Sequence, residues 1–333
     1  MTRVRIHTGE VGAEMEDVDY TDLPSRISAE SGGWIDIFQP EEETARAFLQ
    51  DEMGFHHLAV EDCFEEPGSG SFVYENHKFV TFKARDADRE LDTEYLRAFL
   101  NDGWLITVRH AHMPGIAEFR KRLKDKDFRR DGSMNSEYLL YQLIDSVADD
   151  WNKLLHKKSE RLDELEDQVF DPHNKFPNLL EDLHELHGDL REITKSTTPL
   201  DDVVQTMARP NGDFVTEQTQ VYYRDLAQLT RSIRGRVENY NAGVAATRDT
   251  YFSQTSMLLA QSQAEAADVM RLLTIIATIM LPITAVASIF GMNVEAFGSG
   301  PIPLVPIVSS MAVIGLGMLL WLYMKGFIGG RGN

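Results

Sequence analysis

One side of an apolar segment near the end of the chain carries small hydroxyl side chains among aliphatic ones. Its members are spaced by three or four residues, which places them along one face of an α-helix: Met270, Leu273, Ala277, Leu281, Thr284 and Ser288. We call these six residues the seam. The triplet Gly291, Met292 and Asn293 follows at the end of the same segment. Because the seam has no carboxylate, it offers too few oxygen ligands for a bare divalent cation, and Mg²⁺ gives up its water reluctantly.

A ring of such helices would instead pass a cation that keeps much of its hydration shell. The amide oxygens of Asn293 and nearby backbone carbonyls would receive that shell, and apolar residues such as Met270 and Leu281 would form constrictions that gate by dewetting. Two helices enclose no lumen, so this pathway requires an oligomer. The alternative is that the hydroxyls bond only to carbonyls of their own helix, as they often do.

The seam lies in the first of two long apolar segments. Residues 272–290 and 304–324 contain no charged side chain. At about 1.5 Å per residue, each segment of about 20 residues is long enough to cross a hydrocarbon core of about 30 Å. The sequence therefore predicts a protein that spans the lipid bilayer of the cell (inner or plasma) membrane twice.

The charges beside the two spans predict their orientation. Arg271 precedes the first span, Lys325 and Arg331 follow the second, and Glu295 is the one charge between them. Lys and Arg residues beside transmembrane helices are enriched on the cytoplasmic side of the membrane. We therefore expect both termini in the cytoplasm and the connecting loop outside.

The remaining composition excludes several classes of function. The formal net charge of -20 disfavours nucleic acid as a partner. The N-terminal residues contain no apolar targeting segment, so about 270 residues are expected in the cytoplasm. The single cysteine, Cys63, excludes a disulfide framework. We find no nucleophile–base pair and no glycine-rich phosphate loop, so an enzyme is not expected.

Two periodic patterns of apolar residues predict the strands and helices that precede the seam. Alternating apolar residues predict strands near 34–38, 79–83 and 105–108, as in an α/β domain. Helical spacing then predicts a helix from a Ser136 cap to about residue 170, a second over 178–196 that Pro199 follows, and a third from near Asp213 into the first span, more than about 100 Å long. The predicted organisation is an α/β domain (1–132), a helical hairpin (133–211), a stalk (212–271), a first transmembrane helix (272–292), an external loop (293–303), a second transmembrane helix (304–324) and a cytoplasmic tail (325–333).

The chain resembles the CorA family of magnesium and cobalt (divalent cation) transport proteins. The resemblance rests on Gly291-Met292-Asn293 between two C-terminal spans, and on 274–279 and 282–284 before it. Further segments resemble family motifs in the same order along the chain: 54–62, 138–145 and 223–225. The match extends from about residue 34 to residue 324. Beyond Asn293 the loop departs from the family pattern, and Glu295 is its only acid.

The resemblance implies a funnel-shaped homopentamer whose first spans line the pore at the seam. The triplet, with the Asn293 ring and the Gly291 carbonyls, would form the selectivity filter for hydrated Mg²⁺, and Glu295 would attract cations to the loop. Co²⁺ and Ni²⁺ are further candidate ions. The resemblance also implies a regulatory Mg²⁺ between neighbouring cytoplasmic domains, held by Asp88 (or Asp86) and Asp225. Such an ion would stabilise the closed pore as its concentration rises.

Two other functions fit the same scaffold. One is a zinc transporter coupled to protons, although Met292 as the middle residue of the triplet favours the magnesium branch. The other is a membrane-anchored sensor that transports nothing. Separately, His184 and His187 lie three residues apart near glutamates, which indicates either a transition-metal patch or an exposed helix face.

Overall fold

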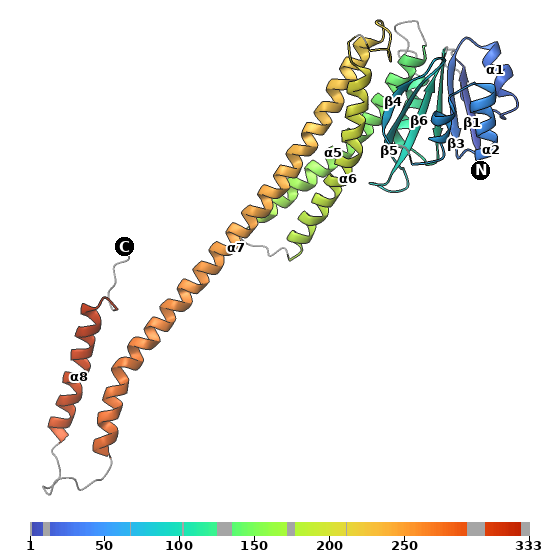
Figure 1. Cartoon of the computed structure of the whole chain (residues 1–333). Helices are drawn as coiled ribbons and strands as arrows, with labels where there is room; N and C mark the ends of the chain where they lie inside the picture. Colours follow the sequence, from blue (N-terminus) through green and yellow to red (C-terminus); the bar gives the residue numbers. More distant parts are fainter. Residues whose placement is uncertain are drawn as a thin grey trace. The chain divides into compact units, whose positions relative to one another are not determined.

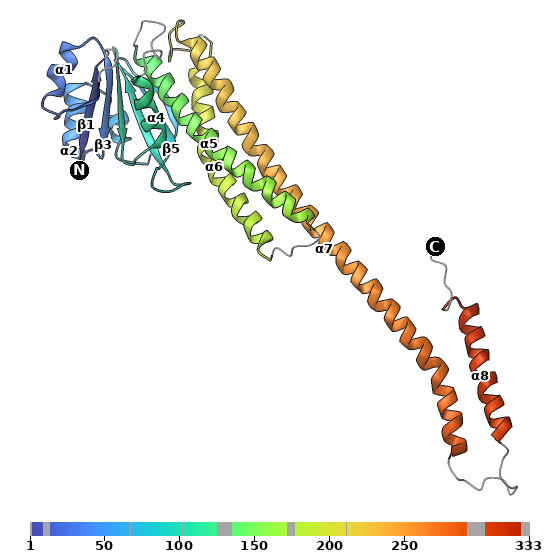
Figure 2. The same cartoon turned by 180° about the vertical axis from the view of Figure 1, so that it is seen from behind.

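The computed structural model describes residues 2–8, 14–66, 68–101, 103–124, 135–171, 177–210, 212–291 and 304–327. The chain forms two compact units, Met1–Asp249 and Thr250–Asn333. Helix α7 (Gln220–Gly291) contributes to both units (Figures 1 and 2).

The first unit is built on a seven-stranded mixed sheet with the order β2-β1-β3-β7-β6-β5-β4. Strands β3 and β7 are parallel, and every other neighbouring pair is antiparallel. The predicted strands are all present, and β6 and β7 pair antiparallel. The strands are β1 (Arg3–Thr8), β2 (Glu16–Asp17), β3 (Gly33–Phe38), β4 (Gly70–Val73), β5 (Lys78–Arg85), β6 (Thr93–Leu100) and β7 (Trp104–Arg109).

Helices cover both faces of this sheet, and β3 is buried along its whole length. Ile35 and Ile37 pack into a core with residues of the short helices α1 (Leu23–Ala29), α3 (His57–Glu61) and the π-helical turn Ala47–Glu52 that follows α2 (Glu42–Arg46). Side chains of a strand alternate between its faces. Trp34 accordingly lies on the other face, where its ring centroid is 4.7 Å from that of Phe119 in α4 (Pro114–Leu123).

Three long helices follow the sheet and lie side by side in the first unit: α5 (Ser136–Phe170), α6 (Leu179–Met207) and the first part of α7 (Figures 1 and 2). The expected helix from about 136 to 170 is present, but its predicted cap is wrong. Asn135 is the N-cap, and its side chain accepts a hydrogen bond from the backbone N–H of Tyr138. Ser136 is already helical, and its hydroxyl donates to the carbonyl of Asn101 instead.

The prediction that Pro199 ends the second helix is also wrong, because α6 continues to Met207 with Pro199 inside it. A proline within a helix loses one backbone hydrogen bond and costs about 3 kcal/mol. Beyond Pro199 the apolar face continues, and Leu200, Val204 and Met207 are each at most 2% exposed. Burying such side chains stabilises the helix by about 1.5–3 kcal/mol each, which outweighs the loss.

Helix α7 begins at Gln220, not near Asp213 as its sequence suggests. The residues before it are held in a turn by Glu137 of α5. The Glu137 carboxylate accepts hydrogen bonds from the backbone N–H and hydroxyl of Thr216, both at 2.9 Å, and from the hydroxyl of Thr219 at 2.5 Å. Lys78 of β5 donates to the same carboxylate at 2.7 Å. Glu137 therefore joins the sheet, α5 and the start of α7.

Replacing Glu137 with glutamine is expected to lower the free energy of unfolding by about 2 kcal/mol, because hydrogen bonds to a buried charge are lost. Burial by itself would raise the pKa of the Glu137 carboxyl, but the hydrogen bonds from Lys78, Thr219 and Thr216 lower it overall. This contribution is therefore present above the ordinary carboxyl pKa and is lost as the pH falls through the lowered value. Thermal unfolding from pH 7 downwards measures it.

The matched control is Glu160→Gln, also on α5, whose exposed side chain pairs with His156. Exposed pairs contribute little. An equal loss of stability in both variants, or no loss for Glu137→Gln, contradicts the structural role of Glu137.

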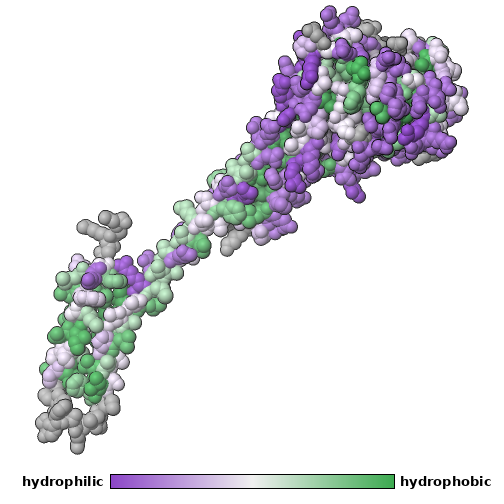
Figure 3. Space-filling model, in the orientation of Figure 1, coloured by the Kyte–Doolittle hydropathy of each residue, from purple (hydrophilic) through white to green (hydrophobic). Residues whose placement is uncertain are grey.

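The second unit contains the rest of α7 and helix α8 (Leu304–Met324), which are long and apolar enough to cross a membrane by length and composition. Hydrophobic residues dominate the surface of both helices in Figure 3. The two helices pack closely at Gly315 of α8, where an added Cβ would lie 3.3 Å from Cδ1 of Ile283. Together with the α/β unit and its long helices, they confirm the predicted fold class.

Candidate ion pathway and regulatory residues

The seam lies on α7, and α8 does not cover it. All six seam residues are exposed in this chain: Met270, Leu273, Ala277, Leu281, Thr284 and Ser288. The partly buried residues of the same span form a different face: Ile275, Thr278, Ile279, Pro282, Ile283 and Val286. At 3.6 residues per turn, the centres of these two faces are on opposite sides of the helix. The single chain therefore leaves the seam free for contact with other molecules.

Hydroxyl groups of the span differ in what they bind. Thr274 donates to the carbonyl of Met270 at 2.8 Å, and Thr278 donates to that of Thr274 at 2.7 Å. These two threonines therefore bond to carbonyls of their own helix, as one of the two interpretations of the sequence predicted. Across the described residues, no such bond is present for Thr284 or Ser288 of the seam. Their hydroxyls are the ones that would face a pathway.

The end of α8 is held by a residue that precedes the first span. Gly326 has a φ of +76°, and the backbone N–H of Phe327 donates to the carbonyl of Leu322, as in a Schellman motif. The Arg271 guanidinium donates to the carbonyls of Gly326 at 2.6 Å and Phe327 at 3.1 Å. A cation at a helix C-terminus also interacts favourably with the helix dipole. In the sequence, Arg271 indicates only the orientation of the spans, because no pattern pairs it with Gly326.

Replacing Arg271 with glutamine is expected to loosen the last turn of α8, since two charge-assisted hydrogen bonds are lost. Amide hydrogen exchange over 322–327 should accelerate by about tenfold. Lys325→Gln, at the same helix end, is the control and should leave exchange unchanged. Equal exchange in the Arg271 variant and the unmodified protein would show that this contact does not hold the helix.

Of the proposed filter, the structure describes Gly291, the last residue of α7. Met292, Asn293 and the loop acid Glu295 lie outside the described residues. Their roles remain predictions.

The proposed regulatory acids Asp86 and Asp88 lie in the turn after β5. The Asp86 carboxylate accepts a hydrogen bond from the backbone N–H of Asp88 at 3.0 Å. The preceding Arg85 makes a bidentate ion pair with Asp150 of α5, at 2.8 and 2.9 Å, and donates to the carbonyl of Glu90. The turn is therefore anchored on α5, while the Asp88 side chain is exposed.

Asp225 lies near the start of α7, and Tyr223, two residues before it, anchors that part of the helix. Tyr223 is fully buried, and its hydroxyl donates to the backbone carbonyl of Glu137 at 2.9 Å. Asp225 itself is exposed. Burial is the main cause of the raised pKa of Asp145 on α5, and the negative charge of Asp225 raises it further. The charge of Asp225 therefore acts on the Asp145 carboxyl of α5.

These α5 carboxylates already have a cationic partner. Arg122 of α4 donates to Asp145 at 2.5 Å and also to Asp149. In the described ranges, no group of three or more His, Cys, Asp or Glu side chains has a geometry that could hold a metal ion. The chain therefore does not bring Asp86 or Asp88 together with Asp225 into such a group. It gives no metal site at His184 and His187 either.

Comparison with known proteins decides the family. A model described as CorA-like Mg²⁺ transporter protein matches residues 30–325. The chain belongs to this family. The resemblance seen in the sequence is confirmed, and the protein is a CorA-family membrane transporter of divalent cations. The family consists of transporters, not enzymes.

Two curated relatives have similar lengths. The putative metal ion transporter YfjQ of Bacillus subtilis is 28% identical over 300 residues, which cover 88% of this chain and 89% of the relative. The cobalt/magnesium transport protein CorA of Thermotoga maritima is 29% identical over 278 residues, covering 82% and 76%. Both names refer to the transport of metal ions.

Two solved structures share the fold. The CorA magnesium transporter of Methanocaldococcus jannaschii has a TM-score of 0.66 at 18% identity, and covers 98% of this chain and 99% of its own. The cytoplasmic domain of ZntB from Vibrio parahaemolyticus has a TM-score of 0.61 at 15% identity, covering 77% and 98%. At such identities the likeness concerns the fold alone, so it does not select the ion.

Proposed function

We propose that this CorA-family transporter is a channel that carries hydrated Mg²⁺ across the cell membrane into the cytoplasm. The observation that supports this most is the placement of the seam. It is free of charge, it faces away from α8, and it carries the hydroxyls of Thr284 and Ser288 that have no partner in the described helix. A lipid-facing surface needs no hydroxyls, whereas a surface beside a hydrated ion benefits from them.

The pathway requires several copies of the chain, and we propose a homopentamer. In it the first spans surround an axis with their seams inward, and α8 of each copy lies outside. Gly291, Met292 and Asn293 form the filter, where Asn293 amides and Gly291 carbonyls receive the first water shell of the ion. Mg²⁺ binds its water strongly, so a filter that accepts the hydrated ion avoids the cost of stripping it. Glu295 attracts cations to the external loop.

Gating by cytoplasmic Mg²⁺ is the second part of the proposal. Asp88, assisted by Asp86, and Asp225 are carried by different elements, and in the described part of one chain they belong to no group that could hold a metal ion. An ion between Asp88 of one copy and Asp225 of the next would hold neighbouring copies together. It would favour the closed state more as the Mg²⁺ concentration rises, because the ion binds that state better. Mg²⁺ is thus both the transported and the regulatory ion.

Two alternatives predict different behaviour. A proton-coupled zinc transporter on this fold would move Zn²⁺ only when a pH gradient is present. A membrane-anchored sensor would move no metal. The family model describes Mg²⁺ transport, which favours the magnesium channel over both alternatives.

The test is a flux assay with purified protein in sealed vesicles. Uptake of Mg²⁺, Co²⁺, Ni²⁺ and Zn²⁺ is measured with and without a pH gradient. We expect Mg²⁺ uptake that responds to membrane potential and persists when the pH gradient is collapsed. Uptake of Zn²⁺ alone, or uptake that stops with the pH gradient, contradicts a Mg²⁺ channel, and no uptake of any ion supports a sensor.

A further inference from the structure

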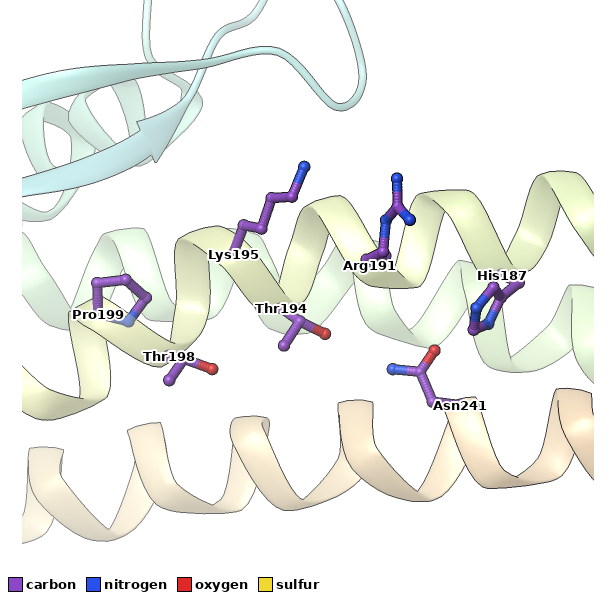
Figure 4. A pocket seen from close by; sticks show the side chains of 7 residues that line it. All are labelled: His187, Arg191, Thr194, Lys195, Thr198, Pro199 and Asn241. Carbon is purple, nitrogen blue, oxygen red and sulfur yellow. The ribbon is translucent and has the colours of Figure 1, made fainter.

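A groove in the first unit lies between α6 and α7 and has a volume of about 480 Å³. This size falls within the range of about 300–1,000 Å³ that small-molecule sites occupy. Figure 4 shows its lining, in which α6 supplies every residue but Asn241 of α7. The lining residues are His187, Arg191, Thr194, Lys195, Thr198, Pro199 and Asn241.

Basic side chains form one rim of this groove. His187, Arg191 and Lys195 follow one another at intervals of four residues, so they lie on one ridge of α6. They extend over about 12 Å along the helix axis. This row is notable on a chain whose formal net charge is -20. It indicates a local site for an anion on an otherwise acidic protein.

Glu192 neutralises part of this positive charge. Lys195 pairs with Glu192 of its own helix at 2.6 Å. Within the described part of the chain, His187 and Arg191 form no ion pair. Both side chains are exposed. The rim can therefore receive an anion without first breaking strong internal pairs.

The groove between α6 and α7 has a polar part at Thr194 and Asn241 and an apolar part at Thr198 and Pro199. Thr194 already donates its hydroxyl to the carbonyl of Leu190 at 2.7 Å. Oδ1 of Asn241 is buried and has no hydrogen-bond partner among the described residues. A buried acceptor without a donor is unfavourable, and a ligand hydroxyl or amine would satisfy it. Pro199 and the methyl group of Thr198 add an apolar surface further along the groove (Figure 4).

We propose that this groove binds an organic polyphosphate of the nucleoside diphosphate or triphosphate class. A single phosphate would reach only neighbouring cations, whereas a chain of two or three phosphates extends along the ridge from Lys195 towards His187. Arginine and lysine are the usual partners of phosphate oxygens. The base would meet the apolar part of the groove beyond Lys195, at Thr198 and Pro199. The proposal does not depend on the ion that the protein transports.

The experiment measures binding of ATP to the full chain in detergent by calorimetry. Free Mg²⁺ is buffered to the same value in cell and syringe, so that chelation by ATP does not change metal occupancy. The variant Arg191→Gln/Lys195→Gln should weaken binding by about tenfold for each cation removed. The control is Lys121→Gln, since Lys121 is also exposed and also pairs with a glutamate three residues before it, Glu118. This variant should bind ATP as the unmodified protein does.

A second variant keeps the cations and changes the charge of the groove. Thr198→Asp should also weaken ATP binding, because it places a carboxylate where the base meets the groove, next to the phosphate bound at Lys195. Thermal unfolding checks that each variant remains folded. Adenosine should bind at least about 100-fold more weakly than ATP, because it lacks charge-assisted contacts.

Three results overturn the proposal. The first is no ATP binding by the unmodified protein, and the second is equal binding by the Arg191→Gln/Lys195→Gln and Lys121→Gln variants. The third is that inorganic triphosphate binds as tightly as ATP, which would mean that the groove does not recognise the nucleoside. Loss of binding in both groove variants, with binding kept in the control, supports it.

Discussion

Replacing Asn293 with alanine is expected to lower Mg²⁺ uptake into vesicles by at least about 100-fold. In the proposed pentamer every subunit contributes one amide oxygen to the hydration shell of the entering ion. A hydrogen bond is worth about 0.5–1.5 kcal/mol, so loss of a whole ring of them reaches this magnitude. Alanine supplies no oxygen in their place, and the ion would have to enter with its shell poorly held.

The control for this experiment is Val294→Ala, which shortens the next side chain and leaves the amide ring intact. It should transport nearly as well as the unmodified protein. Competition between Mg²⁺ and Ca²⁺ in the same vesicles reports selectivity. If Asn293→Ala keeps both the rate and the selectivity, Asn293 is not part of the filter.

Neutralising both proposed sensor acids, by Asp88→Asn and Asp225→Asn together, is expected to weaken closure at high cytoplasmic Mg²⁺. The concentration that halves the flux should rise by about tenfold or more, because the bound ion loses carboxylate ligands that it has only in the closed state. Flux is measured over a range of Mg²⁺ on the cytoplasmic side. The amides keep the size of the side chains, so the folded structure should be unchanged.

Asp163→Asn supplies the matched control, since it removes an exposed acid of α5 that has no part in the proposal. It should leave the inhibition curve in place. An unchanged curve for the double variant would exclude Asp88 and Asp225 as the sensor, while the channel itself would remain supported.

Much of the fold was predictable because the apolar periodicity is strong. The central strand around Trp34 to Phe38 and the long helix from Ser136 to Phe170 both follow from it. The wrong helix boundaries come from packing and hydrogen bonds between segments, which the apolar periodicity of one segment does not indicate. Pro199 is accommodated because residues after it are buried, and α7 starts late because Glu137 binds Thr216 and Thr219.

The candidate sites were predictable to different degrees. The seam could be found because helical spacing fixes which residues share a face, and the structure leaves that face uncovered by α8. Contacts between distant segments gave no such signal. The bond from Arg271 to the end of α8 and the groove beside Asn241 appear only once the helices are packed. The regulatory site is proposed between copies of the chain, so neither one sequence nor one chain defines its geometry.

If the seam lines a pore, water must reach it in the assembled protein. Leu281→Cys places a thiol in the seam, and Ile276→Cys places one on a neighbouring face of the same span; the native side chains are 69% and 50% exposed in the single chain. The one native cysteine gives no background, since Cys63 is fully buried and burial raises the pKa of its thiol to about 12. Only the thiolate reacts with a water-soluble thiol reagent.

Mg²⁺ flux is recorded before and after that reagent is added to each variant in vesicles. We expect that Leu281→Cys is modified and that its flux is blocked, while Ile276→Cys keeps its flux because lipid or protein surrounds that position. Flux that is unaffected in Leu281→Cys, or blocked equally in both variants, would contradict a pore lined by the seam.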